Sequence, residues 1–130
     1  MNLSEILERN ARMYPNDIAL IERLPSQDLR RQITWKQFNE RVNRIANALL
    51  EAGIKKGDRV LHFMKNRMEW MESYFAIIRI GAIVVPLNFR FTSIDLEYVV
   101  KIVDPALTMV ENDLAQIIGP VRAHLEKTGK

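Results

Sequence analysis

Residue types that could carry out chemistry are few in this chain of 130 residues. It contains no cysteine, so disulfides, thiolate nucleophiles, zinc–cysteine sites and iron–sulfur clusters are excluded. Its two histidines, His62 and His124, have no histidine or cysteine at metal-ligand spacing. Each is therefore interpreted as a partly buried or surface side chain that makes one hydrogen bond, rather than as a ligand or a catalytic base.

Nucleotide-binding and nucleophile motifs are also missing from the sequence. The five glycines form neither G-x-G-x-x-G nor the Walker pattern, so no backbone cradle for a phosphate can be drawn. None of the four serines lies in a G-x-S-x-G elbow, which argues against a Ser-His-Asp hydrolase. Glu69 and Glu72 have helical spacing, and this favours a solvated polar face over a pair of catalytic acids.

Two arginines lie at positions that suggest a role. Arg90 lies in Asn88-Phe89-Arg90-Phe91, between a predicted strand and a predicted helix, where ligands of open α/β sheets bind. A phosphate contact and a solvated loop arginine both remain open for Arg90. Arg79 comes late in a predicted helix, where its positive charge interacts favourably with the helix dipole. A set of aromatic residues on helix faces, without interleaved Lys or Arg, is predicted to be core rather than a base-stacking platform. These are Trp35, Trp70, Tyr74 and Phe75.

The elements that must position these residues begin with a helix and a hairpin. Apolar residues at helical spacing predict a helix over residues 3–13. Short apolar runs predict strands over residues 18–21 and 32–35, with the polar residues 22–31 as a loop or hairpin tip between them. Three arginines in that loop are predicted to be solvated. They are Arg23, Arg30 and Arg31.

A long amphipathic helix follows the hairpin. Thr34 and Gln37 form a capping-box pattern at its start, and Gly53 suits the left-handed position that ends it. Its apolar face is predicted to be core. That face consists of Phe38, Val42, Ile45, Ala46, Leu49 and Leu50.

From residue 57 onwards, strands and helices alternate. The predicted strands are Arg59–Met64, Ala82–Leu87 and Ala106–Glu111. The predicted helices run from a cap at Asn66 and Glu69 to Ile80, from a cap at Thr92 and Asp95 to Asp104, and from Leu114 to Lys127 with a break at Gly119-Pro120. This order predicts an α/β fold, with βα units that form a mostly parallel sheet flanked by helices. Residues 1–56 supply a helix, a hairpin and an amphipathic helix, and residues 57–130 supply three βα units.

Composition and charge narrow the class of protein. Apolar residues make up 48% and charged residues 27% of the chain, as in ordinary globular domains. The net charge of +3 is interspersed with acids rather than clustered, which argues against a nucleic-acid partner. The polar start is not a signal peptide, and the longest apolar stretch, Ile80–Leu87, is too short to span a bilayer. We expect a soluble, cytoplasmic domain.

Two features suggest that the chain is part of a larger structure. The predicted helix over residues 68–80 is apolar on most of its circumference, and such a helix expects neighbours on all sides. The last βα unit is not followed by a further strand. We therefore expect an incomplete fold whose partner is the remainder of its own polypeptide. As an isolated chain it is expected to form a homo-oligomer, by edge pairing or by exchange of terminal helices.

Four stretches in order resemble the N-terminal portion of the AMP-forming acyl-CoA synthetases, the adenylate-forming superfamily. They are residues 33–38 (ITWKQF), 57–60 (GDRV), 80–88 (IGAIVVPLN) and 90–92 (RFT). The first is similar to the family's Leu-Thr-Tyr-x-Glu-Leu element, with Trp for Tyr and Gln-Phe for Glu-Leu. The third is similar to its Leu-Gly-Ala-x-x-x-Pro-Leu-Asn element. Each motif alone is weak, but their order and spacing make the match specific over nearly the whole chain.

The resemblance implies an enzyme that joins a carboxylate to CoA through an acyl-adenylate, with ATP, Mg²⁺ and CoA as its cofactors and substrates. The Ser/Thr/Gly-rich phosphate loop, the acidic residues that hold magnesium and ribose, and the catalytic lysine of that family have no match here. We therefore expect an N-terminal fragment that is inactive alone and contains neither a catalytic nor a metal-binding residue. Arg90 is the one position that the resemblance assigns, as a contact for the CoA phosphates. The alternative is a non-catalytic, standalone α/β module that binds a protein partner or its own copy.

Overall fold

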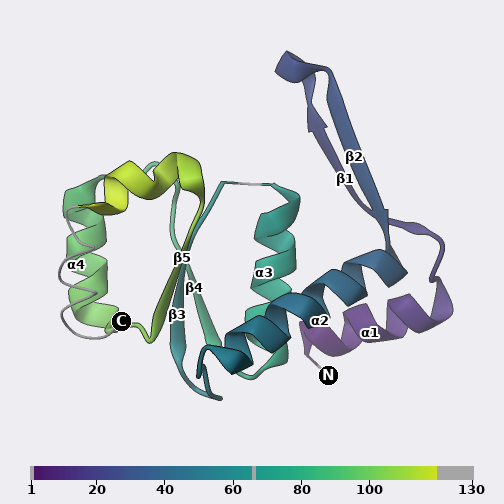
Figure 1. The fold of residues 1–130 in the computed structure, drawn as a ribbon, viewed down its shortest axis with the longest axis horizontal. Helices are drawn as coiled ribbons and strands as arrows, with labels where there is room; N and C mark the ends of the chain where they lie inside the picture. Colours follow the sequence, from purple (N-terminus) through teal and green to yellow (C-terminus); the bar gives the residue numbers. More distant parts are fainter. Residues whose placement is uncertain (1, 66, 120–130) are drawn as a thin grey trace. The chain divides into compact units, whose positions relative to one another are not determined.

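The computed structural model describes residues 2–65 and 67–119 of the chain. Contacts divide the chain into two units, each continuous in space but not in sequence. The first unit consists of Met1–Gly53 and Asn66–Ile80, and the second of Ile54–Lys65 and Gly81–Lys130. Figure 1 labels the helices and strands of both units. No helix among residues 2–65 and 67–119 has the length and apolar character needed to cross a bilayer.

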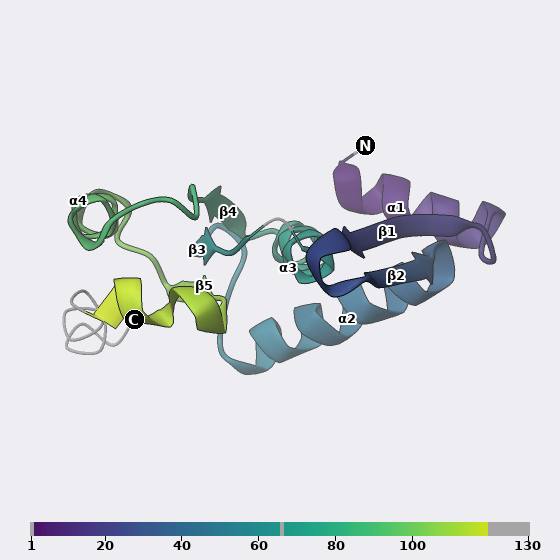
Figure 2. The ribbon, with the colours of Figure 1, turned by 90° about the horizontal axis from the view of Figure 1, so that it is seen from above.

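The first unit contains three helices and a β-hairpin. The helices are α1 (Leu3–Met13), α2 (Trp35–Glu51) and α3 (Met68–Arg79), and the hairpin consists of β1 (Ile18–Leu24) and β2 (Leu29–Thr34). Helix α2 packs against both α1 and α3. Figure 2 shows the two hairpin strands side by side, with β2 leading directly into α2.

The hairpin strands are longer than the sequence predicted. Residues 22–31 were expected to form a loop or hairpin tip, but β1 and β2 pair antiparallel through Glu22↔Arg31 and Arg23↔Arg30 as far as Leu24. The turn is reduced to a short 3₁₀ segment, Pro25–Gln27, and to Asp28 with a φ of +51°. The pair Glu22 and Arg31 has opposite charges, which stabilises the ribbon, whereas Arg23 and Arg30 carry like charges and are both exposed to water.

Both ends of α2 confirm the predicted signals. The Gln37 N–H donates to Thr34 Oγ1 at 3.2 Å, and the Thr34 N–H donates to Gln37 Oε1 at 2.9 Å. Gly53 has a φ of +91°, a conformation that costs glycine little. On the predicted core face, Phe38, Val42, Ala46 and Leu49 are buried. Ile45 is half-buried, and Leu50 is 53% exposed.

Arg79 lies in the last turn of α3, as its interpretation as a charge on the helix dipole requires, and it also joins three helices. Its Nε donates to Ser4 Oγ of α1 at 2.7 Å, and its Nη1 donates to Asn43 Oδ1 of α2 at 2.8 Å. The side chain is only 11% exposed, and Glu8 lies 3.6 Å away. Burial lowers the pKa of Arg79, and the charge of Glu8 opposes this shift. The sequence could not reveal these bonds because Ser4 and Arg79 are far apart along the chain.

The predicted solvated face holds for Glu69, which is exposed, but not for Glu72. Glu72 is 6% exposed, and its carboxylate pairs with Arg41 at 2.9 Å. Glu69 pairs with Arg31 at 2.9 Å, and this hydrogen bond holds the pKa of Glu69 below its usual range. Arg31 also bonds Glu22. Arg31 is exposed, as predicted, but it lies in β2 rather than in a loop, and it pairs with two carboxylates.

The start of α3 is stabilised from the hairpin rather than by a cap in its own sequence. The residue at the N-cap is Arg67, whose side chain makes no capping hydrogen bond. The Met68 N–H instead donates to Glu22 Oε1 of β1 at 3.3 Å. The predicted cap at Asn66 falls on a residue outside the described ones. A carboxylate near a helix N-terminus is favourable, so Glu22 serves here as a cap from another strand.

The second unit is built on a parallel sheet, as predicted. Its strands β3 (Arg59–Phe63), β4 (Ile83–Pro86) and β5 (Leu107–Val110) lie in the order β4-β3-β5. Both pairings are parallel, with Val60 opposite Val84 on one side and Leu107 on the other. Helix α4 (Ser93–Val103) connects the two outer strands. Figure 1 shows it beside the sheet.

The core of the second unit lies between the sheet and the helical segments that follow β4 and β5. Its buried residues are Leu61, Phe63, Leu96, Val100, Leu114 and Ile118. Thr92 and Asp95 form the predicted capping box of α4, which ends at Asp104 with a φ of +50°. Residues 115–119 are helical, and the rest of the predicted helix over 114–127 lies outside the described residues.

Candidate functional site

The carboxyl ends of the three parallel strands are where an α/β sheet normally binds its ligands. Strand β3 ends at Phe63, β4 at Pro86 and β5 at Val110. The residues that follow these strands carry charged side chains, Lys65 after β3, Arg90 after β4 and Glu111 after β5. The candidate site therefore consists of this edge of the sheet and the loop that contains Arg90.

The loop between β4 and α4 holds Arg90 outward. The Phe91 N–H donates to the Asn88 carbonyl at 3.0 Å, and the Arg90 N–H donates to Asn88 Oδ1 at 2.9 Å. Together these bonds close a turn at residues 88–91, in which both the main chain and the side chain of Asn88 accept hydrogen bonds from backbone N–H groups. Phe89 and Phe91 are half-buried and pack against the core of the unit. Two anchored aromatic rings thus flank an exposed arginine.

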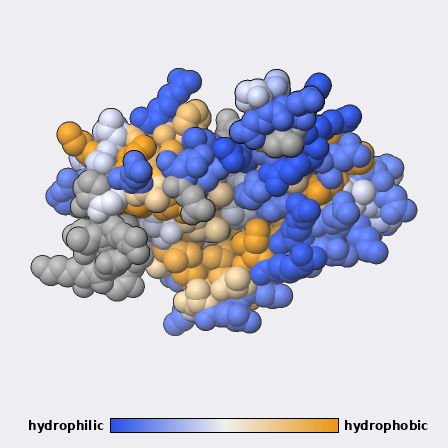
Figure 3. Space-filling view, turned by 45° about the horizontal axis from the view of Figure 1, so that its top comes forward, coloured by the Kyte–Doolittle hydropathy of each residue, from blue (hydrophilic) through white to orange (hydrophobic). Residues whose placement is uncertain are grey.

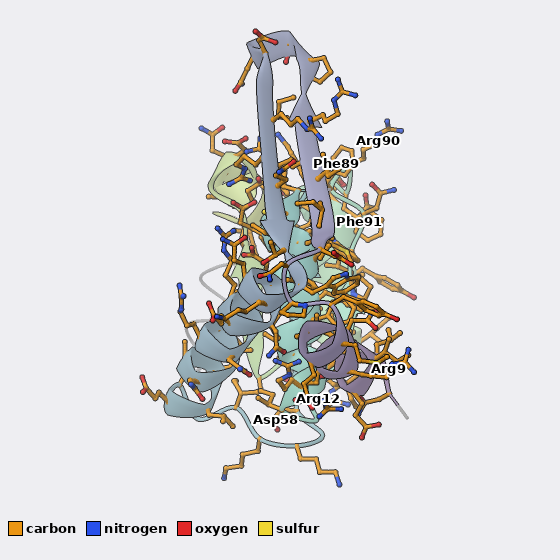
Figure 4. The ribbon with its side chains drawn as sticks, turned by 90° about the vertical axis from the view of Figure 1, so that its right-hand side faces the viewer. Arg9, Arg12, Asp58, Phe89, Arg90 and Phe91 are labelled. Atoms are coloured by element: carbon orange, nitrogen blue, oxygen red, sulfur yellow. The ribbon has the colours of Figure 1, made fainter. Side chains whose placement is uncertain are left out.

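The guanidinium of Arg90 is available to an anion. Its central carbon lies 5.5 Å from the centroid of the Phe89 ring, a distance at which a cation and an aromatic face attract each other. Figure 4 shows Arg90 extending away from the ribbon, next to Phe89. The structure records no acidic partner for Arg90 among the described residues. Its predicted place at the end of a strand is therefore confirmed, and its role stays a prediction.

Lys65 differs from Arg90 because its side chain already pairs with a carboxylate. Its Nζ lies 3.3 Å from Asp113 Oδ2, and its backbone N–H donates to Glu111 Oε2 at 3.2 Å. These bonds join the end of β3 to the residues after β5. Sequence reasoning missed this cluster, although the place of Lys65 directly after a strand was a signal that could have found it.

His62 lies within β3, beneath this edge, and its side chain is fully buried at 0% exposure. This corrects the prediction of a partly buried or surface histidine. Burial lowers the pKa of His62 to about 4, because a charged imidazolium loses its hydration inside the protein. The ring is therefore neutral at pH 7. The other histidine, His124, lies outside the described residues.

The start of α4 is less suited to an anion than a bare helix N-terminus. Asp95 Oδ2 accepts hydrogen bonds from the Thr92 N–H and from Thr92 Oγ1, both at 3.0 Å. The carboxylate therefore occupies the place where a phosphate would gain from the helix dipole. An anion at this edge would meet the side chain of Arg90 rather than a cradle of backbone N–H groups.

The glycines do not contribute a phosphate loop in the part of the chain that the structure describes. Gly57 and Gly81 both have positive φ angles, and the Gly57 N–H donates to the Gly81 carbonyl at 2.9 Å. They precede β3 and β4, so they lie at the amino edge of the sheet. Residues 2–65 and 67–119 also contain no group of three His, Asp or Glu side chains placed to hold a metal ion. These residues therefore do not fit a magnesium site.

A separate cavity of about 340 Å³ lies in the first unit, between β1 and the start of α3. Its walls combine apolar side chains with three charged ones. They are Leu20, Ile21, Glu22, Arg23, Arg67, Met68, Trp70 and Met71. The carboxylate of Glu22 is already bonded to Arg31 and to the Met68 N–H. The four aromatic residues that were predicted to be core lie in the same unit and are half-buried rather than buried. The ring centroids of Trp70 and Tyr74 lie 4.9 Å apart in a stacked pair.

Comparisons with known proteins identify relatives of the chain. The model of the family described as AMP-binding enzyme matches residues 7–129. The long-chain-fatty-acid–CoA ligase FadD13 of Mycobacterium tuberculosis is 30% identical over 128 residues, which cover 98% of this chain and 25% of the ligase. A crotonobetaine/carnitine–CoA ligase of Citrobacter koseri is 39% identical over 89 residues, 68% of this chain and 17% of the ligase.

A solved structure shares the fold. The crystal structure of the N-terminal domain of FACL13 from Mycobacterium tuberculosis matches with a TM-score of 0.85 and 30% identity, over 95% of this chain and 30% of that one. This agreement covers both units of the chain. The chain spans only 17–25% of the length of the two curated ligases named above.

Proposed function

Because this chain belongs to the family of AMP-binding enzymes, we propose that it forms part of an AMP-forming acyl-CoA ligase. In the proposed reaction the carboxylate of an acid attacks the α-phosphate of ATP, and pyrophosphate leaves. The thiolate of CoA then attacks the acyl carbon of the acyl-adenylate, and AMP leaves. The match of the family model over residues 7–129 is the observation that supports this proposal. Fatty acids are the first substrates to test, since the relative FadD13 is named a long-chain-fatty-acid–CoA ligase.

We assign the chemical steps to residues that this chain does not contain. Its described part holds neither a phosphate cradle nor a group of metal ligands, and His62 is buried and neutral. Mg²⁺ is proposed for the complete enzyme only, and no residue of this chain is assigned to it. The role proposed for this chain is to form a scaffold together with the remainder of a longer polypeptide. The reaction of the complete enzyme, which would consume ATP and CoA, is proposed to take place in the cytoplasm.

Arg90 is the residue of this chain to which we assign a substrate contact, with a phosphate group of CoA. Three observations support this role. The side chain is exposed, it follows the carboxyl end of β4, and its loop is anchored by Phe89 and Phe91. A guanidinium binds phosphate oxygens through charge-assisted hydrogen bonds. Such a contact positions CoA and does not take part in the formation of the adenylate.

The ligase proposal is tested with the polypeptide that the complete reading frame encodes. Pyrophosphate release and acyl-CoA formation are measured with ATP, Mg²⁺, CoA and a series of fatty and aryl acids. We expect both products with at least one acid. The 130-residue chain, shown to be folded by circular dichroism, serves as the control and should give neither. A folded complete protein that releases no pyrophosphate with any acid would contradict the proposal, and turnover by the short chain would contradict the predicted inactivity.

The role of Arg90 is tested separately, in the same complete protein, with R90A and R90K. Charge-assisted hydrogen bonds are worth about 1.5–3 kcal/mol, and the exposure of Arg90 places its contribution at the lower end. We therefore expect R90A to raise the KM for CoA by about tenfold. R90K should restore part of this loss, and pyrophosphate release without CoA should stay unchanged. R23A removes another exposed arginine and is the matched control. An unchanged KM for CoA in R90A would refute the assignment.

A further inference from the structure

Helix α4 exposes a line of large apolar side chains. Ile94 is 80% exposed, Tyr98 is 70% exposed and Ile102 is 63% exposed. They are spaced four residues apart, so they follow one another along the same side of the helix. The residues that α4 buries in the core are different ones, Leu96 and Val100. Figure 3 shows that hydrophobic residues reach the surface at several places on the face that it draws, most broadly in the lower centre.

Such a line is not what an ordinary surface helix presents. A helix at the surface of a protein normally has one apolar stripe toward the core and a polar opposite face. Single exposed apolar residues are common, but adjacent ones that form a patch indicate an interaction surface. The α4 stripe, defined as Ile94, Tyr98 and Ile102, is therefore a candidate interface. It is distinct from the loop that carries Arg90.

The order of residues along α4 indicates which partner fits. We propose that the α4 stripe binds the same stripe of a second copy, with the two helices antiparallel about a two-fold axis at Tyr98. Residues equally far from Tyr98 then face each other. Ile94 meets the partner's Ile102, and Asp95 meets the partner's Lys101. An isologous interface requires this kind of self-complementarity.

The charges beside the α4 stripe support this arrangement. Asp95 and Lys101 carry opposite charges, and the symmetry brings them together twice, once on each side of the axis. The capping bonds of Asp95 with Thr92 use only Oδ2 of the carboxylate. Lys101 pairs with Glu97 at 3.0 Å in an exposed pair, which water screens, so it can add a second acidic partner. A parallel arrangement of the two helices would instead place like residues in register and lose these pairs.

The proposal differs from self-association through the open edges of the sheet. One helix from each copy forms a small contact, and small contacts give weak, reversible dimers. We therefore expect a dimer that dissociates on dilution in the micromolar range and not a growing assembly. This inference does not depend on the proposed ligase activity, because it concerns the 130-residue chain by itself.

The first test measures the mass of the 130-residue chain by sedimentation equilibrium over a range of concentrations. We expect a monomer–dimer equilibrium. Y98K places two positive charges at the two-fold axis and should weaken the dimer at least tenfold. Because Tyr98 is exposed, the fold should be retained, as circular dichroism can verify. L50K changes another exposed apolar residue, 53% exposed on α2, and should leave the dimer unchanged. A monomer at all concentrations, or a dimer insensitive to Y98K, would overturn the proposal.

A second test fixes the geometry through disulfides, which is feasible because the chain has no cysteine. Helices packed about 8–10 Å apart bring facing Cα atoms into the range that a disulfide bridges. Y98C should therefore form a covalent dimer rapidly under mild oxidation. A mixture of I94C and I102C chains should give the mixed dimer in preference to either like pair. E51C, at an exposed position on α2, should crosslink only slowly. Equal rates for Y98C and E51C would refute the two-fold axis at Tyr98.

Discussion

Lowering the pH from 7.5 to 5 is expected to destabilise the fold through His62, whose side chain is fully buried in β3. Burial lowers its pKa from 6.5 to about 4 in the folded protein. In the unfolded chain the same imidazole keeps its ordinary pKa. Between these two values the unfolded state binds the proton and the folded state does not. Acid therefore favours unfolding between pH 6.5 and pH 4. Above pH 6.5 His62 is neutral in both states, so it causes no loss of unfolding free energy there.

The size of the effect follows from the two pKa values. Linkage between proton binding and folding predicts a loss of about 2 kcal/mol at pH 5 and about 3 kcal/mol at pH 4. These are large fractions of the stability of a small domain, which is about 5–15 kcal/mol. The loss should be small at pH 7 and reach its full value only below the pKa of the folded state. The sign is opposite to that of a histidine stabilised by an acidic partner.

The assay is urea unfolding followed by circular dichroism at pH 7.5, 6, 5 and 4. The quantity of interest is the change in unfolding free energy from pH 7.5 to pH 5, compared between the native chain and H62Q. Acidic residues contribute equally to both chains and cancel in this comparison. H62Q, which cannot bind the proton, should lose about 2 kcal/mol less over this range.

Proton NMR supplies the direct check, because the chain has only two histidines. The ring signal absent from H62Q belongs to His62, and its position can be followed from pH 8 to pH 3.5. We expect a midpoint near the value of about 4 that burial imposes. A midpoint near 6.5, with equal pH dependence in H62Q and the native chain, would refute the reasoning. It would mean that water reaches the ring in solution.

Three further predictions concern the first unit, each checked by urea midpoints. T34A removes the capping bond of α2 and should cost about 0.5–2 kcal/mol, whereas T34S should cost less; equal losses would contradict the role of the hydroxyl. L49A should cost about 2–5 kcal/mol because Leu49 is buried, and L50A less than half of that because Leu50 is 53% exposed; similar losses would place both in solvent or both in the core. R41M leaves the carboxylate of Glu72, which is 6% exposed, without its ion-pair partner and should cost about 1–3 kcal/mol. The double variant R41M/E72M should recover part of that loss, and strictly additive effects would show that the pair is not coupled.

Short-range signals in the sequence were enough to predict where helices begin and end. The capping boxes at Thr34 and Thr92 are formed as predicted, because their partners lie three residues away. Gly53 has its left-handed conformation for the same reason, since a single residue decides it. The alternation of strands and helices after residue 57 predicted the parallel sheet. The same alternation placed Arg90 after the end of a strand, and the resemblance added its predicted role as a contact for the CoA phosphates.

Tertiary structure alone decided which charged residues are buried and which of them form ion pairs. The spacing of Glu69 and Glu72 is the same as that of a solvated face, and only the approach of α2 and the hairpin supplies Arg41 and Arg31. Arg79 became a bridge between helices because Ser4 and Asn43 meet it from elements far away in sequence.

The sequence of α4 likewise did not reveal which of its two apolar sides faces the core. Its sequence is apolar around most of the helix, so periodicity could not tell which side would meet the core. The sheet buries Leu96 and Val100 and leaves Ile94, Tyr98 and Ile102 exposed. A local pattern specifies backbone conformation because its partners lie within one helical turn. Burial and ion pairing depend on what the rest of the chain brings into contact, and that information is distributed over the whole sequence.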